Sequence, residues 1–547
     1  MNCQDSRKEE PPNQAGPDSE VGCEKLIVMG ILAVLSLMVA LDACVIVTSL
    51  PEIVKGLETN TSGGFWIGTS YLLANAVAML FIADLSEAFG RKPCLTVSVA
   101  FFTIGTIICC LSDTIAQMLT GRSLQGIGGA GIMMLSIVIY TDLVSQSIRP
   151  KWYGIILGAW ALGNCLGPII GGVIAQHTTW RWVFYIMFPF CAVGMVLVPW
   201  KVNVKPRSKT THEKLAMIDW AGGVLFISSS TLFLVAISGG GIQSPWNSVG
   251  TLAPLCLGIA GFVSTLVYET RVTQKPFLNR NLFWGPSPIA VYICGAVQGL
   301  LLYGQLYYIP QFFILVKGFS PVNTGLALLP VMFTLMPGSI ATGFFITRTE
   351  NCQYPIWAGW MLTTIATGLT ILWDANTPAS VWATTLVLLG LGHGAVLNAQ
   401  TTAASQAAFS SVATVRGTEP NEGIATAMYA FLRQFGMAVG VGIGGSTFQN
   451  VFLLNLDMDG LPGNHEAKSQ VNVAELLQVV IDSSARAEIL DACILGLRGV
   501  SCLYVGLSGA ALFVSMWVKR YHLNQFVTTE QKLQNSGKRV LGVAEAA

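Results

Sequence analysis

The sequence predicts an all-α integral membrane protein that crosses the bilayer fourteen times. Of its 547 residues, 52% are hydrophobic and only 11% are charged, whereas soluble domains carry about 25% charged residues. The mean hydropathy is +0.60. Apolar runs of the length that a helix needs to cross the hydrocarbon core recur along the chain. The loops between these runs differ strongly in their basic residues, as a membrane topology requires.

Other classes of protein are disfavoured by composition. The net charge is +1, and no basic patch with interleaved aromatic residues indicates a nucleic-acid partner. The 13 cysteines are scattered, mostly within apolar runs, which favours small buried hydrophobes over metal ligands. Residues 1–25 are polar and are predicted to be a disordered cytoplasmic N-terminus. They do not resemble a cleaved signal peptide, so the first apolar run should itself direct insertion.

Each predicted span is an apolar run of roughly 20 residues, which as a helix crosses about 30 Å. An even number of spans places both termini on the same side of the membrane. In chain order the fourteen spans are 26–50, 64–86, 93–113, 115–140, 152–175, 181–200, 218–239, 249–270, 287–311, 321–347, 355–373, 381–409, 421–449 and 496–518.

The orientation follows from the lysines and arginines. With the termini in the cytoplasm, 22 of the 30 fall in inner segments, 6 in outer segments, and Arg122 and Arg433 inside spans. This asymmetry is the one that the positive-inside rule requires. The N-glycosylation sequon at Asn60 then lies in the first outer loop, and the long polar segment 450–495 is also outside.

The loop between the second and third spans, residues 83–92, reads ADLSEAFGRK. Gly90 suits a tight turn, and the Glu87 carboxylate can pair with Arg91 or Lys92 to form a charge latch that breaks when the helices move. The alternative is an ordinary short basic loop, which is common in proteins with many spans.

The fourth span contains Arg122, Gln125 and Gly126 in the string RSLQGIGGAG. Small residues let neighbouring helices approach closely, while an arginine in a membrane needs a partner or water. The alternative is an arginine whose side chain reaches to the outer surface.

The fifth span contains the string GNCLGPIIGG, residues 163–172. Gly163, Gly167 and Gly171 lie at i, i+4 and i+8, so they form one stripe on a helix face, with Pro168 and Gly172 beside it. A stripe of this kind alone is compatible with ordinary tight packing.

Taken together, these three strings resemble motifs of the major facilitator superfamily: the loop signature GxLxDxxGRK, the string RxxQGxGxA, and the GxxxGPxxGG motif of its drug exporters. The loop departs from its signature at Ala83 and Glu87. Further strings, such as LDACVIVTSLP at 41–51 and FLRQFG at 431–436, are similar to the fourteen-span drug:proton antiporter family. The overall similarity is to its fungal efflux pumps for toxins and secondary metabolites.

The resemblance implies a major facilitator fold of two six-helix bundles, at 26–200 and 281–518. The linker 201–280 would hold two additional helices, and 519–547 a cytoplasmic tail. It further implies a monomer without cofactors that exports a small amphipathic organic compound against a proton gradient. The plasma membrane is the expected location, with the vacuolar membrane as the alternative.

Depth estimates pair two charged residues. Counted at 1.5 Å per residue, Asp42 lies roughly 12 Å and Arg122 roughly 10 Å from the outer ends of their spans. We therefore expect them to interact, directly or through water, and to couple transport to protons. The alternative is a solvated Asp42 on the wall of a wide cavity.

Four polar residues come out near mid-depth and are the candidate substrate cavity: Asn75, Asn164, His393 and Arg433. Arg433 would meet an anionic substrate group or donate to backbone carbonyls. His393 would titrate near neutral pH or act as a packed hydrogen-bonding group.

Two other functions fit less well. An importer of similar fold, for a siderophore or nutrient, is one, and a membrane sensor that transports nothing is the other. An enzyme is disfavoured because no nucleophile–base or metal constellation stands out. No GxxxxGK[ST] string indicates direct use of ATP.

Overall fold

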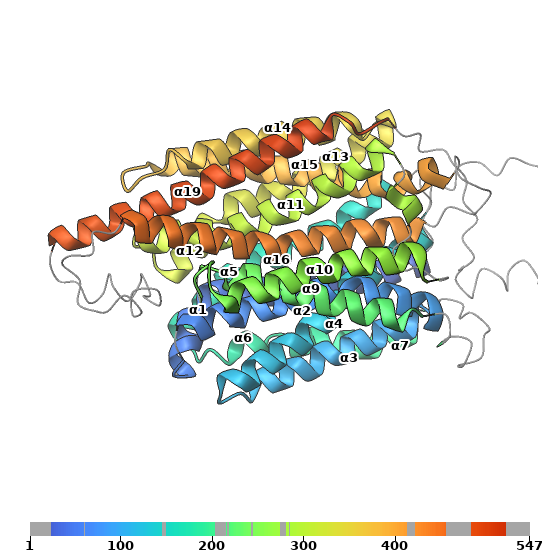
Figure 1. Ribbon diagram of the computed structural model, residues 1–547, viewed down its shortest axis with the longest axis horizontal. Helices are drawn as coiled ribbons and strands as arrows, with labels where there is room; N and C mark the ends of the chain where they lie inside the picture. Colours follow the sequence, from blue (N-terminus) through green and yellow to red (C-terminus); the bar gives the residue numbers. More distant parts are fainter. Residues whose placement is uncertain are drawn as a thin grey trace, which may run out of the picture.

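The computed structural model describes residues 23–59, 61–144, 149–202, 215, 218–241, 244–273, 280–283, 285–412, 422–455 and 483–520. Within these ranges the regular structure is helical, and the long helices run side by side along one axis (Figure 1). We call the end of this bundle at which the first helix stops, at Gly56, the predicted outer end, following the charge bias of the loops.

The first set of helices packs around α4. The helix α1 lies along α5, while α2 and α3 both pack on α4, and α7 covers α3 and α1. The members of this set are α1 (Cys23–Gly56), α2 (Thr61–Phe89), α3 (Arg91–Cys110), α4 (Ile115–Leu143), α5 (Arg149–His177), α6 (Trp182–Tyr185) and α7 (Phe188–Lys201).

The second set has a similar arrangement. The helix α11 packs on α16, α13 and α14 pack on α15, and α19 lies against α14 and α16. The set consists of the short helix η1 (Arg280–Phe283), α11 (Pro286–Gln311), the π-helical turn η2 (Phe312–Val316), α12 (Pro321–Ala327), α13 (Leu329–Thr349), α14 (Gln353–Thr370), α15 (Ala379–Val412), α16 (Glu422–Asn455) and α19 (Ser483–Ser515).

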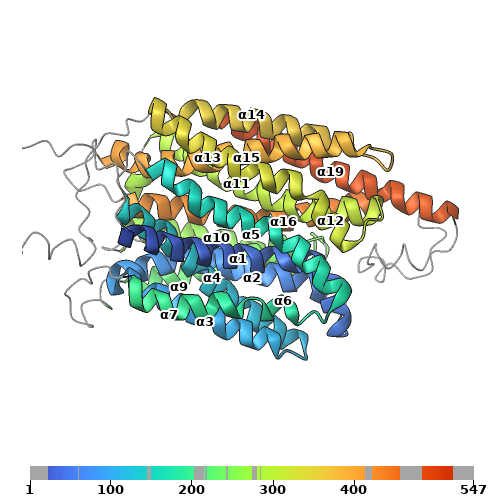
Figure 2. The same ribbon diagram turned by 180° about the vertical axis from the view of Figure 1, so that it is seen from behind.

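Two further helices, α9 (Trp220–Gly239) and α10 (Val249–Arg271), pack on each other between the two sets (Figure 1). The helix α9 contacts both α2 and α16. Rings of α9 and α10 pack there on rings of α16 and form a cluster that we call the aromatic seam: Phe226, Phe233, Phe262, Phe431 and Phe435. On the opposite side of the molecule α5 lies against α12 and α13 (Figure 2).

The predicted all-α membrane fold is confirmed. In the described part of the chain, thirteen helical stretches are long and apolar enough to cross a bilayer. The remaining predicted span, 355–373, corresponds to α14, which has 18 residues. Its composition is less apolar because it begins with Gln353, Tyr354 and Pro355 and contains four threonines. The threonine hydroxyl groups donate to carbonyls of preceding turns and so are satisfied within the helix.

Helix ends differ from the expected ones mainly in the second set. The helix α16 continues to Asn455 and α19 begins at Ser483, so both extend into the segment predicted as outer loop 450–495. A polar exposed face masks the extension of α19 in a hydropathy plot, but its other face is apolar. There Ile489 and Cys493 pack against the fully buried Phe452 of α16. At the other end of the chain, α1 starts at Cys23, within the predicted disordered segment 1–25.

Candidate functional site

A buried ion pair joins α1 to α4. The Arg122 Nη1 atom donates to Oδ2 of Asp42 at 2.7 Å. The side chain of Asp42 is 0% exposed and that of Arg122 is 1% exposed. The structure therefore brings the two predicted residues into direct contact. It leaves neither a solvated Asp42 nor an Arg122 that reaches to the surface.

Gln125 closes the pair into a three-residue network. One turn further along α4, its Oε1 accepts from Arg122 Nη1 at 2.8 Å, while its Nε2 donates to Asp42 Oδ1 at 3.2 Å. The same Nε2 donates to Thr106 of α3 at 2.9 Å. Gln125 is fully buried. Both carboxylate oxygens of Asp42 thus have a donor, as a buried charge requires.

Arg122 is also held by α2. Its Nε donates to the carbonyl of Ile67 at 3.3 Å, and its guanidinium lies 4.3 Å from the ring centre of Tyr71. This contact with a ring face is a cation–π interaction. Gly126 permits it, because a Cβ atom there would lie 2.5 Å from the carbonyl oxygen of Tyr71. Tyr71 is a member of the network that the sequence did not reveal.

The glycine stripe of α5 packs on α1. A Cβ atom at Gly163 would lie 2.5 Å from the carbonyl of Leu37, and one at Gly167 would lie 2.6 Å from Cβ of Cys44. At Gly171 the carbonyl of Val45 is closer still. The backbones are therefore in contact, and any side chain at these positions would push the helices apart.

The remaining motif residues of α5 connect it to other elements. Gly172 faces the second set, where a Cβ atom would lie 2.8 Å from the carbonyl of Pro321 in α12. The carbonyl of Pro168 accepts from Thr48 of α1 at 2.8 Å. The motif thus places one helix against both sets.

Asn164 links the two sets of helices. Its Oδ1 accepts from Sγ of Cys44 at 2.9 Å and from the hydroxyl of Tyr303 in α11 at 3.4 Å. The ring of Tyr303 lies 6.3 Å from that of Trp160 in α5. Because Cys44 follows Asp42 by two residues, the ion pair and this contact between the sets share one turn of α1.

Arg433 of α16 is buried without a charged partner in the described part of the chain. It is 2% exposed, and its guanidinium lies 5.5 Å from the ring centre of Trp160 and 6.0 Å from that of Tyr429. Its Nε and Nη1 atoms have no hydrogen-bond partner among the described residues. The described residues therefore do not show Arg433 donating to backbone carbonyls, which was one of the two expectations from the sequence.

A second unsatisfied group belongs to α11, the helix that packs against Arg433. Gly299 of α11 packs directly on the backbone of Arg433. Its neighbour Gln298 is fully buried, and neither amide atom of Gln298 has a hydrogen-bond partner among the described residues. Buried polar groups are normally satisfied, so such exceptions indicate a ligand, water or a second conformation.

The other two predicted cavity residues lie elsewhere. Asn75 is buried beside Tyr71, since a Cβ atom at Gly129 would lie within 3 Å of both side chains. His393 Nε2 pairs with Oε1 of Gln305 at 2.9 Å, which is the packed hydrogen-bonding arrangement. Among the contacts of the described residues, none brings Asn75 or His393 to Arg433.

The loop motif forms a latch with more partners than expected. Gly90 has a φ of 101°, which favours glycine. Arg91 donates to the hydroxyl of Ser86 at 2.6 Å and lies 3.7 Å from the Glu87 carboxylate. It also lies 3.5 Å from Asp142, at the inner end of α4. Asp142 was not identified from the sequence, although it is a lone carboxylate at the end of a predicted span.

Asn60, the candidate glycosylation site, lies outside the described residues. Lys92 directly follows Arg91 and is half-buried.

The chain was compared with known proteins. Residues 32–441 match the family model described as Major Facilitator Superfamily. An "MFS transporter L2" of a Phoma species is 32% identical over 93% of this chain and 84% of its own. An "MFS-type efflux pump LUC4" of a Fusarium species is 31% identical over 97% and 93%, respectively. The "MFS efflux transporter aclA" of Aspergillus oryzae is 34% identical over 75% and 73%.

Solved structures show the same fold at low sequence identity. The human organic anion transporter MFSD10 superposes with a TM-score of 0.57 at 14% identity, over 90% of this chain and 99% of its own. A bacterial homologue of the lysosomal transporter Spinster, inward-facing and occupied, superposes with a TM-score of 0.56 at 16% identity, over 93% and 100%.

Proposed function

Because this chain belongs to the major facilitator superfamily and is a membrane transporter rather than an enzyme, we propose that it is a proton-coupled exporter. Its cargo would be a small amphipathic organic compound, of the toxin or secondary-metabolite kind. The two sets of helices would expose a central site to one side of the membrane and then to the other. A proton gradient would supply the energy, without a cofactor or ATP.

The direction of transport rests on the relatives. Of the curated relatives that match most of this chain, one is named an efflux pump and another an efflux transporter. An importer of similar fold remains the second candidate. It predicts that cells without the gene lack the substrate, whereas an exporter predicts that they accumulate it.

Proton coupling is supported by one observation, the buried network of Asp42, Arg122 and Gln125. Protonation of Asp42 would remove the negative charge that Arg122 faces and would turn one carboxylate oxygen into a donor. The hydrogen bonds between α1 and α4 would then rearrange. Because the neighbouring Cys44 contacts Asn164, which contacts Tyr303 of the second set, this change would reach the interface between the sets.

The cargo site that we propose lies at this interface. Trp160, Tyr303 and Tyr429 supply aromatic faces, Asn164 supplies a polar group, and Arg433 supplies a positive charge. Two nitrogens of this buried guanidinium have no hydrogen-bond partner among the described residues, so a bound anionic group would stabilise it. We therefore favour a cargo with a carboxylate or similar group attached to an apolar body.

The proposal is tested in vesicles that contain the purified protein and an imposed pH difference. A panel of aromatic and aliphatic organic acids, with their neutral methyl esters as matched controls, is followed inside and outside. In vesicles that contain the wild-type protein, we expect the acids to move in the direction opposite to the proton flow. If no compound moves faster than through protein-free vesicles, or if movement ignores the pH difference, the exchange mechanism is excluded.

The cellular setting is part of the proposal. We place the protein in the plasma membrane as a monomer with both termini in the cytoplasm; the vacuolar membrane is the alternative. A fluorescent C-terminal fusion locates it, and protection of that tag from external protease tests the orientation. Metabolite profiles of cells and medium, with and without the gene, would identify the cargo.

A further inference from the structure

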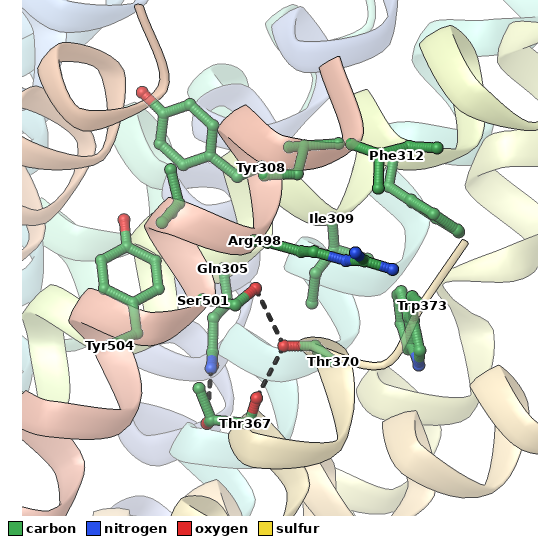
Figure 3. A pocket seen from close by; sticks show the side chains of 13 residues that line it. Gln305, Tyr308, Ile309, Phe312, Thr367, Thr370, Trp373, Arg498, Ser501 and Tyr504 are labelled. Carbon is green, nitrogen blue, oxygen red and sulfur yellow. Dashed lines mark hydrogen bonds between the residues drawn. The ribbon is translucent and has the colours of Figure 1, made fainter. Parts of the chain in front are cut away.

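A small cavity lies apart from the central site, at the predicted outer end of the second set (Figure 3). It has a volume of about 40 Å³, which is room for roughly two or three water molecules or one small polar group. Residues of α11, η2, α14, the turn after α14, and α19 surround it, among them Tyr308, Phe312, Trp373, Arg498 and Ser501.

The charge of the lining is one-sided. Among the described residues, Arg498 of α19 is the one charged side chain that lines the cavity, and none of the described lining residues is acidic. Its buried Nε atom has no hydrogen-bond partner in the described part of the chain. The side chain extends into the cavity between Trp373 and the α11 residues (Figure 3).

A second unsatisfied donor is present. The indole of Trp373 is 4% exposed, and its Nε1 has no partner among the described residues. An indole N–H can only donate. The hydroxyl of Ser501, 3.0 Å from that of Thr370, adds one more group that can donate into the cavity, because the Thr370 hydroxyl donates to the carbonyl of Thr367 at 2.7 Å (Figure 3). A cavity that is lined, among the described residues, by one cation, an indole donor and a hydroxyl donor, and by no carboxylate, is complementary to an oxyanion.

The walls indicate what accompanies the anionic group. Phe312 lies 5.1 Å from Trp373, ring centre to ring centre, and Tyr308 also faces the cavity. One wall is tied to the interior of the set, because Gln305 donates to Thr367 at 2.8 Å and pairs with His393. A cavity of this size takes the carboxylate or phosphate group alone, at Arg498, so an apolar tail attached to that group would lie outside the cavity.

We propose that this cavity is an oxyanion-binding site, separate from the central cargo site. It would take the carboxylate of an organic acid or the phosphate of a lipid headgroup, held by Arg498 and Trp373. The proposal does not depend on the direction of transport or on proton coupling.

The test uses the full-length protein in a maltoside detergent and a buffer free of phosphate and carboxylates. The unfolding temperature is measured at increasing concentrations of benzoate or of inorganic phosphate, with chloride at equal ionic strength as the reference. Native mass spectrometry during stepwise removal of lipid reports retained phospholipid. The variants are Arg498→Gln, Arg498→Lys, and Arg486→Gln as the matched control. Arg486 is an exposed arginine of the same helix.

We expect a benzoate- or phosphate-dependent rise in the unfolding temperature, or one retained phospholipid. Arg498→Gln should weaken either effect roughly ten- to hundred-fold, the range expected for a charge-assisted hydrogen bond, while Arg498→Lys restores part of it and Arg486→Gln changes nothing. Stabilisation by the free anions identifies an organic acid site, and retention of phospholipid alone identifies a lipid site. If Arg498→Gln does not fold, Trp373→Phe should still weaken binding several-fold. The proposal is overturned if the anions and phospholipid bind equally well to wild type and to both Arg498 variants. It is also overturned if Arg486→Gln weakens binding as much as Arg498→Gln does.

Discussion

Replacing Asp42 by asparagine tests the buried network most directly. The Asp42 carboxylate accepts from Arg122 through one oxygen and from Gln125 through the other. An amide has only one acceptor oxygen, so one donor loses its partner and the buried Arg122 loses its counter-charge. Removing one partner of a buried ion pair costs about 3–5 kcal/mol. We expect Asp42→Asn to fold less stably and to transport at a rate that no longer responds to pH.

A double variant separates stability from coupling. Asp42→Asn with Arg122→Gln removes the uncompensated charge, so it should unfold at a higher temperature than either single variant, because the costs of two changes in contact are not additive. Its transport should still ignore the pH gradient. Thermal unfolding in detergent and transport into vesicles with and without the gradient measure the two effects. If the ratio of the transport rate with the pH gradient to the rate without it is the same in Asp42→Asn as in wild type, Asp42 does not couple transport to protons.

Three further changes test other parts of the molecule. Arg433→Gln should weaken binding of an acidic cargo roughly ten- to hundred-fold while leaving its methyl ester unchanged; equal effects on both would contradict an anionic contact. Gly171→Ala should cost about 1–3 kcal/mol by overpacking α5 on α1, whereas Gly30→Ala, which meets no atom within 4 Å, should be neutral in the same unfolding assay. Arg91→Gln should remove the latch to the carboxylates at the ends of α2 and α4 and raise the accessibility of introduced inner cysteines to a thiol reagent, relative to the same cysteines in a wild-type background.

Hydropathy and helix rise were sufficient to predict the membrane fold and the contact of Asp42 with Arg122. Both depend only on position along an axis, which the chain order gives directly. The partners of that contact were not predictable in this way. Whether Tyr71 turns toward Arg122, or Asp142 toward Arg91, depends on the rotation of each helix and on close packing at glycines, which a single sequence does not specify.

Arg433 illustrates the same limit in the second set. Its depth was readable from the sequence, and Tyr429 precedes it by one turn of the same helix, but its other neighbour, Trp160, comes from α5. Trp160 belongs to the first set, so the pair forms only when both sets are assembled. The four residues expected at one depth therefore separate into distinct environments, because equal height in a bundle does not imply the same side of a helix.

The position of α9 has a thermodynamic consequence. This helix contacts α2 on one side and α16 on the other, so it must slide against at least one of them whenever the two sets separate. The outward side chains of its partner α10 are large and apolar, such as Val249, Leu257 and Val263, so lipid tails surround this edge. Hydrocarbon that fills an opening there replaces one apolar neighbour with another. In the mechanism proposed above, the bilayer would therefore oppose movement along the aromatic seam only weakly, and membrane composition would be a determinant of the transport rate.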